Sequence, residues 1–261
     1  MPEAAQQCPA CQRRVRSGTQ FCPACGQNLL APAAAVPAPT PAPAKELAGG
    51  RRFVQLWEEL KRLAWLFGLL LGTSFIFGIV WRGIRSPWLE VMETAVMAAI
   101  VLIAVSQRYP RLKFLFEVHS SSLREAAILV GVAVLFVVLA SAYFELLAHL
   151  GVPIAKATGT LQRAGWPLWA VLLLVSVAPG VFEELAFRGV IQSSLERMLN
   201  ARDAWLIQAA LFSVLHLSPL IFPSHFLMGL CFGYMRKRSR SIYPGMLLHA
   251  CWNALVVVGE F

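Results

Sequence analysis

The sequence predicts an all-α protein: a polytopic membrane helical bundle of about seven spans, preceded by a small cysteine-rich module. Two properties predict the bundle. The chain has 261 residues, of which 57% are hydrophobic and only 14% charged, and its mean hydropathy is +0.62; soluble domains carry about 25% charged residues. The charges also cluster between long apolar runs, which is typical of helices that cross a bilayer.

Three zones follow one another along the chain. Residues 1–29 carry two cysteine pairs, residues 30–50 alternate Ala and Pro, and residues 51–261 are mostly apolar. The Ala/Pro zone cannot build a core and favours an extended, semi-rigid linker. The first 50 residues contain no apolar run long enough for a cleavable signal peptide, so we expect insertion to begin at a helix that stays in the protein.

The cysteines of the first zone stand as Cys8-Pro-Ala-Cys11 and Cys22-Pro-Ala-Cys25. Each CxxC turn directs two thiolates at one metal, and two such turns complete the tetrahedral four-cysteine site of structural zinc. Gly26 follows the second pair, where the turn needs a positive φ. So small a module has almost no core, so metal binding would supply its folding free energy. Two disulfides are the alternative, but the topology predicted below places this end in the reducing cytoplasm.

The module resembles a bacterial zinc ribbon of the CPxCG type. That resemblance implies a structural zinc ion and a role in contacting a partner protein or in tethering. The two remaining cysteines, Cys231 and Cys251, lie in apolar runs and are interpreted as packing residues.

The apolar zone divides into seven candidate spans. The fifth and sixth are short and are separated by Pro219 and Pro223, so we expect them to be tilted, broken or re-entrant. The expected spans cover roughly 63–81, 88–105, 124–148, 167–191, 204–218, 222–235 and 243–258.

Basic residues orient these spans. With the N-terminus in the cytoplasm, most Lys and Arg of the apolar zone fall in cytoplasmic segments, and the outer segments carry only Arg82, Arg85, Lys156 and Arg163. The positive-inside bias therefore predicts a cytoplasmic N-terminus and an outer C-terminus, and we expect a multi-pass protein of a cell membrane, the bacterial inner membrane. The net charge of +9 is explained by this pattern, so no nucleic-acid partner is expected.

The first of three polar motifs inside the late spans is EExxxR, formed by Glu183, Glu184 and Arg188. Ionisable groups in a spanning helix cost about 2.5–3.5 kcal/mol each on insertion scales, so they are candidates for function. Glu184 and Arg188 are four residues apart and can form a buried ion pair. Glu183 lies about 100° around the helix without a local cation, so it could act as a base. A structural ion pair with a second glutamate beside it is the alternative.

The second and third motifs place Phe212 with His216 and His249 with Asn253, each pair four residues apart on one helix face. Taken alone, His216 is more simply a core residue, and His249 with Asn253 an interhelical hydrogen-bonding pair. Together with the glutamates they supply an acid, a base and hydrogen-bond donors. Such a set in one wet pocket can activate a water and stabilise a tetrahedral intermediate. His225, between the fifth and sixth spans, is interpreted as an exposed loop residue.

EExxxR, FxxxH and HxxxN in this order on late membrane helices resemble the CPBP family, which comprises CaaX prenyl endopeptidases and bacteriocin-processing or self-immunity (Abi) proteins. The resemblance covers roughly residues 165–258, without departures at the defining positions. It implies an intramembrane endopeptidase acting on membrane-associated proteins or peptides. By family analogy, Glu183 and His216 would activate the water, Glu184 paired with Arg188 would orient the site, and His249 and Asn253 would stabilise the oxyanion.

The resemblance leaves three questions open. Metal use in the active site is one; the sequence has no HExxH helix, and a metal-free, glutamate-dependent site is favoured. A non-catalytic membrane scaffold or immunity protein is an alternative function. A proton-coupled carrier is another, against which the first half of the chain has no repeat of the polar motif.

Overall fold

The computed structural model describes residues 5–30, 44–80, 84, 86–118, 123–153 and 156–261. It divides into two compact units, Met1–Arg51 and Arg52–Phe261. Of the linker expected over residues 30–50, residues 31–43 lie outside the described residues, and the chain is helical from Ala44.

The first unit holds the only sheet in the described residues. Strand β1 (Ala5–Gln7) pairs antiparallel with β2 (Arg14–Arg16), and an isolated bridge joins Phe21 to Asn28. Each CxxC turn is closed by a backbone hydrogen bond, from Gln12 N–H to the Cys8 carbonyl and from Gly26 N–H to the Cys22 carbonyl, both 2.8 Å. Gly26 has the expected positive φ of 74°, and Gln12 adopts 60° at the equivalent place.

The second unit is helical, as the sequence predicts, and its first helix begins before the unit boundary, at Ala44. Its elements, with the π-turns and 3-10 turns labelled η, are α1 (Ala44–Phe75), η1 (Ile76–Val80), α2 (Pro87–Ser106), α3 (Tyr109–Leu112), η2 (Lys113–Phe116), α4 (Leu123–His149), α5 (Gly159–Arg163), α6 (Leu168–Leu172), η3 (Leu173–Val177), α7 (Ala178–Glu184), η4 (Leu185–Ile191), α8 (Gln192–Met198), α9 (Ala201–Leu215), α10 (Phe222–Ser239) and α11 (Tyr243–Glu260). The segments from α6 to α8 follow one another without a break, so they form one long helix that carries the π-turns η3 and η4.

Four helices of the described residues are long and apolar enough to cross a membrane: Phe53–Ile79, Pro87–Ser106, Leu123–His149 and Leu168–Met198. Helix α9 has 15 residues, or about 22 Å at 1.5 Å per residue, which is short of a ~30 Å hydrocarbon core. Helix α10 ends in basic residues, and α11 carries the polar residues of the HxxxN motif. The count of about seven spans therefore stays a prediction.

The first helix begins earlier than the sequence predicts. It begins at Ala44, well before residue 63, and includes Glu59 and Arg62. Hydropathy locates the apolar part of a helix and not its start, because a helix can extend beyond the apolar segment with polar residues on its surface.

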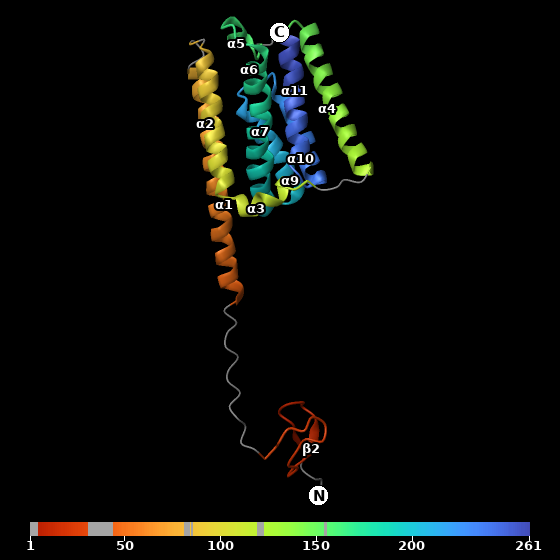
Figure 1. Cartoon of the computed structure of the whole chain (residues 1–261). Coiled ribbons are helices and arrows are strands. Elements are labelled where there is room, and N and C mark those ends of the chain that lie inside the picture. Colours follow the sequence, from red (N-terminus) through yellow and green to blue (C-terminus); the bar gives the residue numbers. More distant parts are fainter. Residues whose placement is uncertain (1–4, 31–43, 81–83, 85, 119–122, 154–155) are drawn as a thin grey trace. The chain divides into compact units, whose positions relative to one another are not determined.

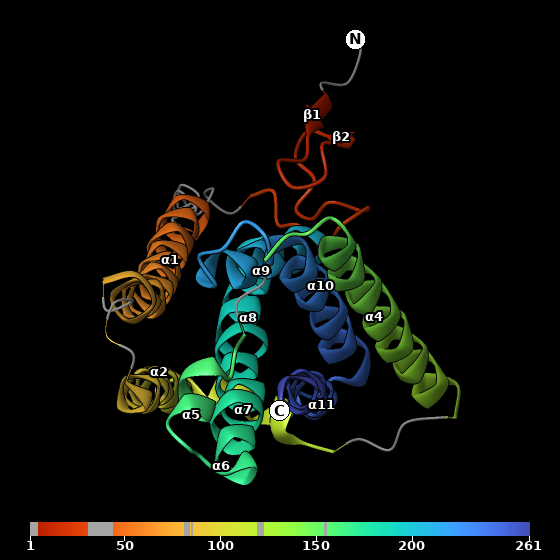
Figure 2. The same ribbon diagram turned by 90° about the horizontal axis from the view of Figure 1, so that it is seen from above.

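The long α6–α8 helix lies centrally in the bundle (Figures 1 and 2). Helices α1 and α2 lie on one side of it, and α11, α10 and α4 on the other. Small residues allow close approach: a Cβ on Gly229 of α10 would stand 2.6 Å from the Cα of Ala209 on α9, and one on Gly180 of α7 would stand 3.0 Å from the Cβ of Ala250 on α11. These contacts hold together the helices that carry the three motifs.

Candidate active site

The EExxxR motif lies where α7 passes into the π-turn η4, which begins directly after Glu184. Arg188 Nη1 donates to Glu184 Oε1 at 2.7 Å, and both side chains are fully buried. A π-turn within a helix is frequent at functional sites because it redirects side chains. The ion pair expected from the four-residue spacing therefore exists, on the inner face of the central helix.

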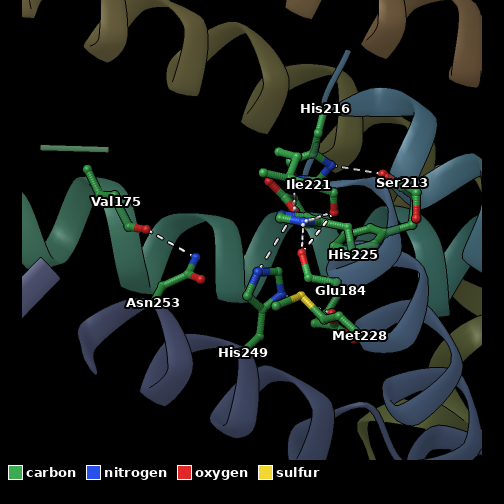
Figure 3. A network of polar contacts seen from close by, with 12 residues as sticks. Val175, Glu184, Ser213, His216, Ile221, His225, Met228, His249 and Asn253 are labelled. Carbon is green, nitrogen blue, oxygen red and sulfur yellow. Dashed lines mark hydrogen bonds and ion pairs between the residues drawn. The ribbon is translucent and has the colours of Figure 1, made fainter. Parts of the chain in front are cut away.

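His249 reaches this pair from α11. Its Nδ1 lies 3.1 Å from Glu184 Oε1 and its Nε2 lies 3.9 Å from Glu183 Oε2. Figure 3 shows the imidazole directed at Glu184. A carboxylate only accepts, so Nδ1 carries the proton of this contact. Glu184 is thus held between a guanidinium and an imidazole, and it orients the imidazole beside Glu183.

His216 approaches Glu183 from the end of α9. Its Nδ1 donates to the Phe212 carbonyl at 2.9 Å. The proton of the neutral imidazole is therefore on Nδ1, and Nε2 is left as an acceptor. That Nε2 lies 4.0 Å from Glu183 Oε2, too far for a direct hydrogen bond. Within the described residues, Glu183 Oε2 has no hydrogen-bond partner. The next residue, Leu217, has a φ of 51° and ends the helix.

The contacts of Phe212 show why the FxxxH motif begins with an aromatic residue. Its ring is fully buried, and the Arg188 guanidinium lies 4.4 Å from the ring centroid in a cation–π contact. The ring also meets those of His216 and His249, with centroids 5.1 and 6.0 Å away. Phe212 therefore packs between the cation and both histidines.

Asn253 lies apart from this group along α11 (Figure 3). Its Nδ2 donates at 3.2 Å to the carbonyl of Val175, in the π-turn η3. The structure brings together Glu183, Glu184, Arg188, His216 and His249, whereas the contact shown for Asn253 ties α11 to the central helix. Its assignment as an oxyanion donor stays a prediction.

A cavity of about 700 Å³ opens beside the group. Its walls come from η1, α2, α7 and the end of α9, and both Glu183 and His216 line it. Glu184 and Arg188 are fully buried and His249 nearly so, and none of them lines it. Glu183 and His216 therefore face the cavity. The buried Glu184–Arg188 pair and His249 lie behind them, away from the cavity.

Sequence reasoning missed two residues of this region. Glu93 of α2 lines the same cavity; an ionisable residue in an apolar run was the signal for it. Gly245 of α11 also went unnoticed: a Cβ there would stand 2.8 Å from Glu184 Oε2, so only glycine leaves room for this carboxylate.

The interpretation of His225 as an exposed loop residue is wrong. It lies in the first turn of α10 and is half-buried, with its ring centroid 4.0 Å from that of His216. Its Nδ1 lies 3.0 Å from the Ile221 carbonyl. Pro223 did not exclude a helix here, because proline is tolerated in the first turn, where its missing N–H would have no partner.

The four cysteines of the first unit form a separate site. Their Sγ atoms all lie within 4.8 Å of one another, with Cys8 to Cys25 at 3.7 Å and Cys11 to Cys22 at 3.6 Å. Four sulfurs about 2.3 Å from one tetrahedral zinc would be separated by about 3.8 Å. The residues therefore fit a metal ion.

Residues 165–255 match the family model of the type II CAAX prenyl endopeptidases, Rce1-like. The resemblance stated from the three motifs is confirmed over this segment. Comparison with curated proteins and with solved structures gave no match.

The Rce1-like segment contains all three polar motifs, whereas the cavity walls from η1 and α2 lie outside it. The match indicates a protease that acts within a membrane on a peptide substrate. Together with the four apolar helices it supports a membrane protein.

Proposed function

We propose that the chain is an intramembrane endopeptidase in which Glu183 and His216 activate the attacking water. The observation that carries the proposal is the pair Glu183 Oε2 and His216 Nε2, 4.0 Å apart on the wall of one cavity. Arg188 pairs directly with Glu184 and not with Glu183. Glu183 is therefore the carboxylate available to take a proton.

In the proposed reaction a water lies between Glu183 Oε2 and His216 Nε2 and attacks the scissile carbonyl carbon. The new C–O bond forms as one water proton passes to Glu183. Glu183 then gives that proton to the leaving nitrogen as the C–N bond breaks. His249 is oriented by Glu184 and would stabilise the oxyanion through an N–H on Nε2, which requires a proton there in addition to the one on Nδ1. The second N–H of Asn253 would be the other donor. No step of this scheme is routed through a metal.

We further propose a CaaX-type substrate, a peptide carrying an isoprenoid near its C-terminus, with bacteriocin-like peptides as the alternative. The match to the type II CAAX prenyl endopeptidase family supports this class. An apolar chain on the substrate would also remain in the bilayer while the peptide enters the cavity, which lies among the apolar helices.

The direct test uses the purified full chain in liposomes with a farnesylated CaaX peptide and its unprenylated counterpart, and detects the products by mass spectrometry. The wild type should cleave the farnesylated peptide, and Glu183→Gln should not. Glu145→Gln is the matched control, since Glu145 is exposed on α4 away from the cavity lining. Equal cleavage by wild type and Glu183→Gln would overturn the role proposed for Glu183, and no cleavage by the wild type would leave a non-catalytic membrane protein.

For the remaining zones we propose a zinc ribbon over residues 1–29, a linker over 30–50 and a protease domain over 51–261, with the N-terminus in the cytoplasm of a bacterial cell. The cysteine geometry supports zinc. Elemental analysis should find one zinc per chain, lost in Cys22→Ser. If Cys22→Ser stays active after treatment with a chelator, the active site needs no metal; loss of activity on chelation would contradict the metal-free mechanism.

A further inference from the structure

A second cluster of charges lies around Glu59 of α1. Three arginines from other parts of the bundle reach this one carboxylate: Arg108 Nη1 at 3.2 Å, Arg111 Nη1 at 2.7 Å and Arg197 Nη2 at 3.2 Å. The cluster therefore holds three guanidinium groups for one carboxylate. Two positive charges remain after the carboxylate is counted.

The excess charge lies on the more exposed arginines. The side chain of Arg108 is only 8% exposed, whereas that of Arg111 is 60% exposed and that of Arg197 33%. Arg108 also donates to Ser194. Arg197 Nη2 also donates to Ser194, at 3.1 Å. A guanidinium carries five N–H donors, so Arg111 and Arg197 keep donors for a further acceptor beyond these contacts.

A hollow of about 590 Å³ lies against these arginines. It is lined by Arg62, Arg111 and Arg197, by Glu58 and Glu59, and by Gln55 with two apolar neighbours, Val54 and Leu56. Its other acidic residue, Glu58, pairs with Lys61 at 2.6 Å. The hollow thus combines excess guanidinium groups with an apolar wall.

The hollow also lies at the ends of three candidate spans. One begins at Phe53, one ends at Ser106 directly before the Arg108 and Arg111 segment, and one ends at Met198 beside Arg197. Helix α3 lies at this end of the bundle (Figure 1). Residues that flank span ends lie at the level of lipid headgroups. Anionic lipids attract arginine there, and the planar guanidinium binds phosphate through two parallel hydrogen bonds.

We propose that this hollow binds the phosphate of an anionic membrane lipid, with the acyl chains along the apolar wall. The phosphate takes the donors of Arg62, Arg111 and Arg197 that Glu59 leaves unused. The bound lipid joins α1 and α3 to α8, the last turns of the helix that carries Glu183. Excess positive charge at the span ends and an apolar wall beside it favour a lipid over a free anion.

Native mass spectrometry of the solubilised full chain tests this proposal. The protein is titrated with phosphatidylglycerol, with phosphatidylcholine and with inorganic phosphate. The wild type should retain phosphatidylglycerol in preference to the other two. Arg62→Gln/Arg111→Gln should bind it about thirty-fold more weakly, five- to six-fold for each arginine. The matched control Lys237→Gln/Arg240→Gln removes two exposed charges at the end of α10 and should bind as the wild type does.

Each other result overturns the proposal. Equal losses in both double variants would show diffuse charge attraction and no built site. Tighter binding of inorganic phosphate than of phosphatidylglycerol would assign the hollow to a free anion. If the first double variant fails to fold, Arg62→Gln decides, since it leaves all three ion pairs of Glu59 in place: it should bind five- to six-fold more weakly, and unchanged binding refutes the lipid site.

Discussion

Two clusters of carboxylates and guanidinium groups differ in their balance. In the candidate active site, two carboxylates lie beside one guanidinium, and Arg188 pairs with Glu184 and not with Glu183. Around Glu59, one carboxylate is shared by three arginines. In both places the most buried groups are paired, and the group in excess, Glu183 or Arg111, faces a cavity. In both clusters of this protein, the charged group without a full partner, and not the ion pair, is the candidate for chemistry or binding.

The largest expected effect concerns the excess carboxylate. Glu183→Gln and His216→Gln should each lower kcat for peptide cleavage by about 10²- to 10⁴-fold, the usual contribution of a general base. Because both act on one water, the double variant should lose little more than either single variant. Rates are measured at saturating peptide on protein shown to be folded by its thermal unfolding. Fully additive losses would show that the two groups act separately.

The next largest effect is expected on stability, when the ion pair between Glu184 and Arg188 is broken. Arg188→Met should lower the free energy of unfolding by about 3–5 kcal/mol, because it leaves Glu184 buried without its cation. Glu184→Met/Arg188→Met should recover much of that loss, since no charge then stays buried unpaired. Unfolding in mixed micelles measures both variants. A double variant as unstable as Arg188→Met would show that the ion pair stabilises the fold beyond mutual compensation.

Glu59→Gln should have a smaller effect, about 1–2 kcal/mol, because only Arg108 among its partners is deeply buried. Anionic lipid should restore part of that stability by supplying the missing negative charge. Thermal unfolding is compared in phosphatidylcholine with and without phosphatidylglycerol. A loss as large as that of Arg188→Met, insensitive to lipid, would remove the distinction between the two clusters.

The smallest effect compares two glycines of α11. Gly245→Ala should lower stability by about 1–2 kcal/mol and reduce kcat, because the new Cβ would stand 2.8 Å from Glu184 Oε2 and displace that carboxylate. Gly259→Ala is the matched control, since a Cβ there meets nothing within 4 Å, and alanine favours a helix more than glycine does. Equal behaviour of the two variants would show that the space above Glu184 is not needed.

Local spacing in the sequence was sufficient for some of these features. The four-residue separation predicted the Glu184–Arg188 pair, and the CxxC turns predicted both the four-cysteine cluster and the positive φ of Gly26. The helices after residue 81 also begin and end within a few residues of the expected spans, apart from the central helix, which runs on to Met198. These predictions succeed because each depends on the geometry of one helix or one turn.

Other features depended on neighbours that spacing does not reveal. Asn253 shares a helix face with His249 yet donates to Val175, because the π-turn η3 lies opposite it on the central helix. Glu93 lines the cavity because of the way α2 packs, and Glu59 contacts the arginines because of the way α1 packs. Sequence periodicity could not place Glu93, since α2 is apolar on nearly every side and shows no preferred inner face. Glu59 lies in the charged first half of α1, and its arginine partners come from segments far away in the sequence.

The membrane class of this protein, its four-cysteine module, the Glu184–Arg188 pair and the residue types available for hydrolysis follow from the amino-acid sequence. The packing of the helices was needed to show that Glu183, His216 and His249 meet beside one cavity, that His249 contacts Glu184, and that three arginines converge on Glu59. The physical reason is the range of the interactions: contacts within a turn follow from backbone geometry, whereas contacts between helices depend on the rotation and depth at which each helix packs.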